Sequence, residues 1–197
     1  MEKLFGKKDS RRQGGALVLY TSRHGATERF ARRIAQPLDA LVKEAAYAKV
    51  EKAKTYDAIV LGCCVYADRI KGLDFFADHA MELADKRLVL FTCGLYDPAI
   101  PEIRKKLDGQ IEKALGEAAG HVSVFHLRGG VRWNSLGLIE RMMLKALVSD
   151  MKKKPQESRT LLEQQMIDTE DGVIDFSDEA DIDAIVHAAR FGGRGKE

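Results

Sequence analysis

Short apolar runs alternate along the chain with longer stretches whose apolar residues recur at helical spacing. Five runs are rich in residues that favour strands: one that begins near Ala16, and the segments 44–50, 56–65, 86–94 and 121–127. The stretches that follow them predict helices at 26–43, about 69–84, about 99–115 and about 136–151. This alternation is typical of a parallel sheet covered by helices on both faces.

A last helix is predicted within "SDEADIDAIVHAAR", residues 177–190. Ser177 is its candidate N-cap, and Glu179 and Asp181 follow near the positive end of the helix.

The distribution of apolar residues within each predicted strand indicates the place of that strand in the sheet. The runs 59–65 and 88–93 are apolar at successive positions, as expected of central strands buried on both faces, whereas 44–50 is mixed and suits an edge. Right-handed crossovers between five strands favour a doubly wound α/β sheet, in which ligands bind beyond the carboxyl ends of the strands.

Length and local composition predict one folded domain. The 197 residues suit a single domain, since domains typically hold roughly 100–200 residues. Residues 1–15 are polar, basic and contain glycine, so we expect a flexible leader at 1–15, a folded domain at 16–191 and a flexible tail at 192–197.

Charge and hydropathy exclude several classes of protein. Lys and Arg number 32 against 30 Asp and Glu, a balance that argues against nucleic acid as a partner. No apolar run reaches the roughly 18 residues of a membrane span, and the start "MEKLFGKKDSRRQGG" is charged where a signal peptide is apolar. We therefore expect a cytoplasmic protein.

The three cysteines, Cys63, Cys64 and Cys93, fall at the ends of two predicted strands. An odd number with two adjacent members indicates neither a disulfide framework nor a spaced metal site. A redox role is the alternative to simple packing. Because adjacent strand residues point to opposite faces, packing is favoured.

The turn "TSRHGATE" joins the first predicted strand to the first predicted helix, where backbone N–H groups and the positive helix end can face an anion. Ser22 and Thr27 add hydroxyls, Gly25 permits a positive φ, and Ala26 keeps the turn uncrowded. The turn lacks the GxxxxGK[ST] and GxGxxG patterns, so a terminal monophosphate is the favoured ligand. An ordinary strand-to-helix connection remains the alternative.

The motif "YTSRHGATERFARRIA" is similar to the flavodoxin phosphate loop [ST]-x-x-G-x-T, with His24 where many flavodoxins have threonine. "YDAIVLGCCVYADRI" and "LVLFTCGLYD" resemble the strands and flavin loops that follow it in that family. The segment "LRGGVRWNSLGLIERMMLKAL" resembles the corresponding segment in the flavodoxin-domain branch that contains the menaquinone-dependent protoporphyrinogen oxidases. The likeness covers about 16–190.

This resemblance implies a three-layer flavodoxin-like sandwich with a five-stranded parallel sheet in the order 2-1-3-4-5, and one noncovalently bound FMN. It assigns three loops to the cofactor. The phosphate loop comprises Thr21, Ser22, Arg23, His24, Gly25, Ala26 and Thr27; the ring loops comprise Cys64, Val65, Tyr66 and Ala67, and Cys93, Gly94, Leu95 and Tyr96. Tyr66 is the candidate for stacking on the ring, with a packing tyrosine as the alternative. Asp97 and Pro98 are expected to begin the next helix.

The predicted helix at about 136–151 is an addition to a minimal flavodoxin. Leu136, Ile139, Met143, Ala146 and Leu147 lie close to one helical face, which Leu138, Met142 and Leu144 widen; Lys152, Lys153 and Lys154 follow. We expect this helix to pack over the sheet. The alternative is a helix in 136–154 that meets a partner or a lipid surface at the inner face of the membrane.

Arg128, Arg132 and Trp133 precede that helix. They are candidates either for contact with an acidic or flat substrate over the flavin, or for holding the loop.

The function implied by the resemblance is an FMN-dependent oxidoreductase, similar to protoporphyrinogen oxidase, whose chemistry takes place on the flavin. Its redox partner would be a protein, a quinone or a small molecule. The net charge of +2 differs from the strongly acidic surface of a shuttle flavodoxin. An electron-transfer module without small-molecule turnover, and a module that binds another phosphate ligand, are the alternatives; oligomeric state is not indicated.

Overall fold

The computed structural model of the protein describes residues 15–133, 136–168, 172–176 and 182–192. Apart from Gly15 and Gly192, the expected leader and tail lie outside these residues, as does the candidate cap Ser177 together with Glu179 and Asp181.

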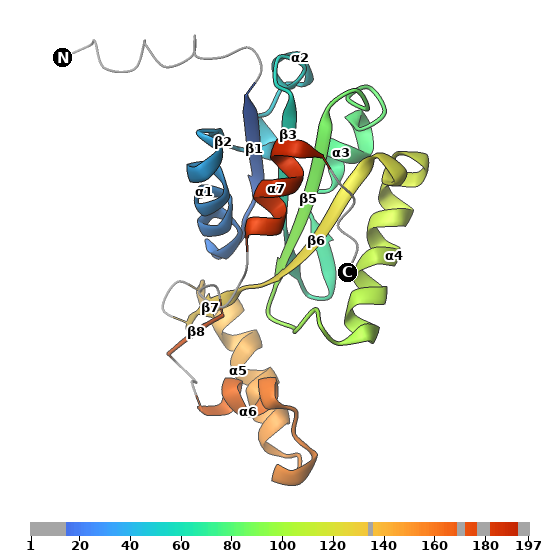
Figure 1. Ribbon diagram of the computed structural model, residues 1–197. Coiled ribbons are helices and arrows are strands. Elements are labelled where there is room, and N and C mark those ends of the chain that lie inside the picture. The colour runs from blue at the N-terminus through green and yellow to red at the C-terminus, as the bar shows by residue number, and fades with distance from the viewer. Residues whose placement is uncertain (1–14, 134–135, 169–171, 177–181, 193–197) are drawn as a thin grey trace, which may run out of the picture.

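A parallel sheet forms the centre of the molecule (Figure 1). Its strands are β1 (Ala16–Thr21), β2 (Leu41–Glu44), β3 (Ala58–Tyr66), β5 (Arg87–Gly94) and β6 (Val122–Arg128), in the order β2-β1-β3-β5-β6. Counted without the short β4 (Arg69–Lys71), which pairs antiparallel with β3, this is the predicted order 2-1-3-4-5. The predicted fold class is confirmed.

Helices cover both faces of the sheet (Figure 1). On one face lie α1 (Ala26–Leu38) and α7 (Asp183–Phe191), and on the other α3 (Asp74–His79) and α4 (Pro101–Leu115). Alternate strand residues supply the two cores: Leu17 and Leu19 pack toward α3 and α4, while Val18 and Tyr20 pack toward α1 and α7. The period-2 alternation of a strand therefore builds two apolar layers from one sequence.

The edge strand lies earlier than predicted. The expected strand at 44–50 is wrong, because β2 ends at Glu44 and the chain continues as the 3₁₀ turn η1 (Ala45–Tyr47) and the short α2 (Val50–Ala53). The helix expected at 26–43 ends at Leu38, where Asp39 takes a left-handed conformation with φ 47°. A left-handed residue stops a helix and turns the chain, which frees 41–44 to pair with β1.

A hairpin replaces the start of the helix expected at 69–84. Ala67 and Asp68 both have positive φ, 47° and 63°, and form a two-residue turn between β3 and β4. Positive φ at both central residues is typical of a type I′ turn, which matches the twist of paired strands. The helix then begins only at Asp74, and α4 begins at Pro101 rather than near Pro98.

A second unit lies beyond the carboxyl edge of the sheet (Figure 1). It consists of β7 (Gly130–Arg132), α5 (Leu138–Lys152), the 3₁₀ turn η4 (Gln156–Ser158), α6 (Leu161–Asp168) and β8 (Val173–Asp175), with β7 and β8 antiparallel. Its core contains Trp133, Val148, Met151, Met166 and Phe176. The expectation that the helix at 136–151 packs over the sheet is therefore wrong; it packs on α6, which the sequence did not predict. A further 3₁₀ turn, η2 (Gly116–His121), leads from α4 into β6.

Candidate functional site

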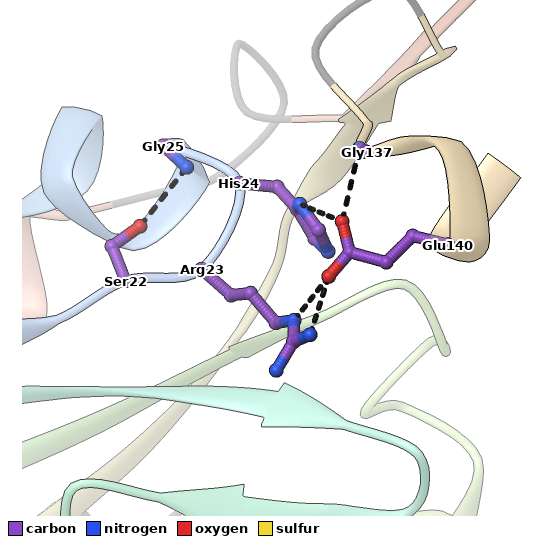
Figure 2. A network of polar contacts seen from close by, with 6 residues as sticks. All are labelled: Ser22, Arg23, His24, Gly25, Gly137 and Glu140. Atoms are coloured by element: carbon purple, nitrogen blue, oxygen red, sulfur yellow. Dashed lines mark hydrogen bonds and ion pairs between the residues drawn. The ribbon is translucent and has the colours of Figure 1, made fainter.

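The turn between β1 and α1 presents backbone donors at the carboxyl edge of the sheet. Gly25 is the N-cap of α1, with φ 83° and ψ −12°, and its N–H donates to Oγ of Ser22 at 3.1 Å (Figure 2). Within the described part of the chain, no side chain caps α1. The first N–H groups of the helix are therefore left to a ligand or to water, the arrangement that binds anions at helix N-termini.

A cavity of about 610 Å³ begins at this turn. It extends past the ends of β3 and β5 to a far wall made by α5 and α6. The lining residues are Ser22, Arg23, His24, Ala26, Thr27, Cys64, Val65, Tyr66, Ala67, Asp68, Cys93, Gly94, Leu95, Tyr96, Gly130, Leu136, Glu140, Met143, Leu144, Leu147 and Met166. The cavity thus joins a polar end to a longer apolar part, as sites for organic cofactors do.

The structure brings nearly all of the predicted cofactor residues to this cavity; Thr21 and Gly25 do not line it. Gly25 contributes its backbone conformation. Thr21 faces Gly72, where an added Cβ would come within 2.2 Å of the Thr21 hydroxyl oxygen. Thr21 therefore lies apart from the cavity lining, and the structure gives its expected cofactor contact no support.

The end of β6 and the residue that follows it contact the end of β5 and the loop after it. Arg128 donates from Nε to the carbonyl oxygen of Leu95 at 3.3 Å, and its guanidinium lies 3.6 Å from the ring centroid of Phe176. A Cβ added at Gly129 would come within 2.4 Å of Cys93 Sγ, so this close approach requires glycine. Of the two roles expected for Arg128, the structure supports loop fixation.

The other two candidate substrate residues differ in outcome. Trp133 is fully buried in the core of the second unit, so its expected substrate contact is wrong. Its indole nitrogen is buried with no hydrogen-bond partner in the part of the chain that the structure describes. The side chain of Arg132 lies outside the described residues.

Like Asp68, Glu140 is a charged residue of the cavity that sequence reasoning missed. It projects from the first turn of α5 and accepts hydrogen bonds from Arg23 and, at 3.2 Å, from the backbone N–H of Gly137 (Figure 2). The available signal was an acidic residue at the N3 position of a predicted helix, the position from which a carboxylate caps its own helix. Contact with Arg23 depends on where α5 lies, which the pattern did not reveal.

The charges at the polar end are coupled. The hydrogen bond from Arg23 is the main cause that lowers the pKa of the Glu140 carboxyl, and the same bond raises the pKa of the Arg23 guanidinium. Burial lowers the pKa of His24; Glu140, whose Oε2 lies 3.9 Å from His24 Nδ1, acts in the opposite direction. The Arg23 guanidinium lies 4.1 Å from the ring centroid of Tyr66, so one face of that ring carries a cation.

The cysteines behave as core residues. All three are buried and free. Burial is the main cause that raises the pKa of the Cys93 thiol to about 12, and it also raises the pKa of the Cys63 thiol. A hydrogen bond from the Thr27 side chain acts in the opposite direction on Cys93. Thiols of this kind are poor nucleophiles at neutral pH.

The doubly wound sheet, the uncapped turn after β1 and the two loops at the ends of β3 and β5 define a protein of the flavodoxin-like class. A sequence model of the flavodoxin domain family matches residues 17–159. The chain belongs to this family.

Comparison with solved structures gives similar chains in bacteria. A flavodoxin from Megasphaera elsdenii is 20% identical over 57% of this chain and 85% of its own, with a TM-score of 0.45. Flavodoxin 2 from Bacillus cereus is 24% identical over 58% and 84%, with a TM-score of 0.44. A flavoprotein in complex with FMN from Lactobacillus acidophilus is 16% identical over 58% and 92%, with a TM-score of 0.37. Comparison with curated proteins gives no match.

Proposed function

We propose that the protein binds one FMN noncovalently in the cavity and acts as an FMN-dependent redox protein. The observation that carries the proposal is the polarity of the cavity: donors without a capping side chain lie at one end, and apolar and aromatic residues line the rest. FMN has the matching distribution, with a phosphate at one end and a flat ring at the other.

The residues present fit that cofactor. Ser22 and the backbone of residues 24–27 would hold the phosphate, while Tyr66 and Tyr96 lie on the two loops that would border the ring. Bound flavin supplies one- or two-electron chemistry. The chain's own contribution is to hold the ring in a largely apolar cavity and to keep Arg23 and Glu140 at its polar end.

The finer proposal is an oxidoreductase that passes electrons between a substrate and a quinone-type or protein partner, as in the protoporphyrinogen oxidase branch. The apolar wall of α5 and α6 supports this, because Met143, Leu147 and Met166 extend the cavity beyond the two loops. The near-neutral charge also differs from the acidic surface of a shuttle.

Spectroscopy and kinetics separate the proposal from its alternatives. We expect a yellow protein whose flavin absorbance bleaches on reduction, and whose reduced form is reoxidised by quinones in stopped-flow mixing. Flavin binding with no small-molecule turnover would support an electron-transfer module. A colourless protein that fails to take up added FMN would contradict the cofactor assignment.

A second proposal concerns the exposed face of α5, which we propose meets the surface of an anionic membrane. Leu138, Ile139 and Met142 are 64–78% exposed on this one helix, and a lysine run at 152–154 follows. Lysines beside an exposed apolar face suit anionic headgroups. Among the helices that the structure describes, none is long and apolar enough to cross a bilayer, so contact would be peripheral.

Vesicle co-sedimentation tests this surface. We expect the Ile139→Gln/Met142→Gln protein to bind vesicles of anionic phospholipid less than wild type does. Met81→Gln is the matched control, because Met81 is 57% exposed elsewhere on the molecule. No binding by wild type, or equal binding by all three proteins, would contradict the proposal.

A further inference from the structure

A second, smaller cavity of about 210 Å³ lies on the α4 side of the loops that follow β3 and β5. It shares Val65, Asp68, Gly94 and Tyr96 with the large cavity. The remaining lining residues are Thr92, Pro98, Ile103, Lys106, Leu107 and Leu127. The same loops therefore separate two cavities.

The lining suits a small apolar ring. Most of these residues are apolar, and a dry apolar cavity of about 150 Å³ is large enough to bind benzene. The two charged members, Asp68 and Lys106, pair with each other at 2.8 Å, and their side chains are more than half exposed. The space therefore suits one aromatic ring with a small substituent.

Thr92 is the buried polar residue of this lining, and it begins a chain of hydrogen bonds. Its Oγ1 lies 2.8 Å from Nδ1 of His126, and Nε2 of His126 lies 2.9 Å from Oδ1 of Asp108. The His126 side chain is 4% exposed and that of Asp108 is 44% exposed. The chain thus runs from the cavity to the surface of α4.

The tautomer of His126 sets the direction of these hydrogen bonds. A carboxylate oxygen accepts, so the tautomer that matches Asp108 carries its hydrogen on Nε2. In the imidazole tautomer that donates from Nε2 to Asp108, Nδ1 is an acceptor, and the Thr92 hydroxyl donates to it. In that arrangement the single Thr92 hydroxyl hydrogen is used by His126, so the Thr92 oxygen can accept a further hydrogen bond but cannot donate one.

We propose that this cavity binds a small aromatic alcohol, of the phenol class, whose hydroxyl donates to Oγ1 of Thr92. A ring that carries an ether or no oxygen fills the same space without this bond. A site that hydrogen-bonds a ligand hydroxyl discriminates against analogues that lack it. The proposal does not rest on FMN, although the two cavities share the loops that follow β3 and β5.

The test compares ligands with and without a hydroxyl on proteins with and without the Thr92 hydroxyl. Binding of p-cresol, 4-methylanisole and toluene to the full-length protein as purified is measured by calorimetry. We expect wild type to prefer p-cresol to both other rings. Thr92→Val should lower p-cresol affinity about tenfold, the scale of one hydrogen bond, and leave toluene affinity unchanged.

Two further measurements distinguish ligand binding at Thr92 from a purely structural role of its hydrogen bond to His126. Thr92→Ser keeps the hydroxyl and should keep the preference for p-cresol. Amide shifts in ¹⁵N spectra should fall on Thr92 and Leu107, which line only the small cavity. The proposal is overturned if wild type shows no preference for p-cresol, if Thr92→Val weakens toluene and p-cresol equally, or if shifts occur only at the large cavity. The comparison of ligands on wild type decides the matter even if a variant fails to fold.

Discussion

The carboxylate of Glu140, on α5, accepts a hydrogen bond from Nε of Arg23 at 2.7 Å, and so joins the added helical unit to the loop that begins α1 (Figure 2). The two residues are 117 positions apart in sequence. The pair places a negative charge beside a turn whose backbone favours anions.

Removal of that charge should strengthen phosphate binding. We expect Glu140→Gln to raise the affinity for FMN a few-fold, because Arg23 is released and repulsion of the phosphate is removed. Fluorescence titration of apoprotein with FMN measures the effect. Glu163→Gln is the matched control, since Glu163 pairs with Lys154 in the same unit without lining the cavity, and should leave the affinity unchanged. A weaker FMN complex in Glu140→Gln would contradict this account.

Thr27 provides a direct test of the phosphate loop. We expect Thr27→Ala to weaken FMN binding by about 1–3 kcal/mol, the scale for loss of a hydrogen bond to a charged group. Thr21→Ala is the control, because Thr21 faces Gly72 and should leave the affinity unchanged. Equal affinities for wild type and Thr27→Ala would remove Thr27 from the site.

The positive φ of Gly25 predicts a conformational cost without a clash. No atom lies within 4 Å of a Cβ added at Gly25, so Gly25→Ala should cost about 1–2 kcal/mol of unfolding free energy from backbone strain alone. Gly109→Ala, inside α4 with equally open space, should stabilise the protein by about 0.5–1 kcal/mol. Denaturant unfolding of both variants measures the contrast, and equal shifts in the same direction would contradict it.

His24 should make stability depend on pH. Burial lowers its pKa below the ordinary 6.5, and this outweighs the opposite effect of Glu140. The unfolded chain then takes up a proton at a higher pH than the folded protein does. The unfolding free energy should therefore fall as pH drops below about 6.5, until His24 titrates in the folded state.

Comparison with His24→Gln isolates this contribution. The unfolding free energy of wild type minus that of His24→Gln should be constant above the ordinary histidine pKa. It should fall as the pH drops below that value. A difference that does not vary with pH would show that His24 is not responsible.

The buried cysteines should resist modification. Because burial is the main cause that raises the pKa of Cys93 to about 12, we expect its thiol to react with Ellman's reagent much more slowly in the folded protein than in denaturant. Rapid reaction of all three cysteines under native conditions would contradict the packing assignment.

The sequence by itself determined the parts of the molecule that rest on local pattern. Continuous apolar runs predicted β3 and β5 as central strands, and the alternation of elements predicted a parallel sheet covered by helices; the strand order came from the resemblance to flavodoxins. The two ring loops were found because they immediately follow such strands. The turn before α1 was found because Gly25 and the hydroxyl of Ser22 are local signals for an anion at a helix N-terminus.

Tertiary contacts decided the remainder. An apolar face such as that of α5 specifies that a helix has neighbours, but not whether they are the sheet or α6. Residues 67 and 68 take positive φ because β4 pairs with β3. Neither alanine nor aspartate has a strong enough preference for positive φ to reveal this turn from the sequence. Glu140 and Trp133 show the same limit. Glu140 lines the cavity and Trp133 is buried because of where α5 and the β7–β8 ribbon lie. Packing between distant segments determines that placement.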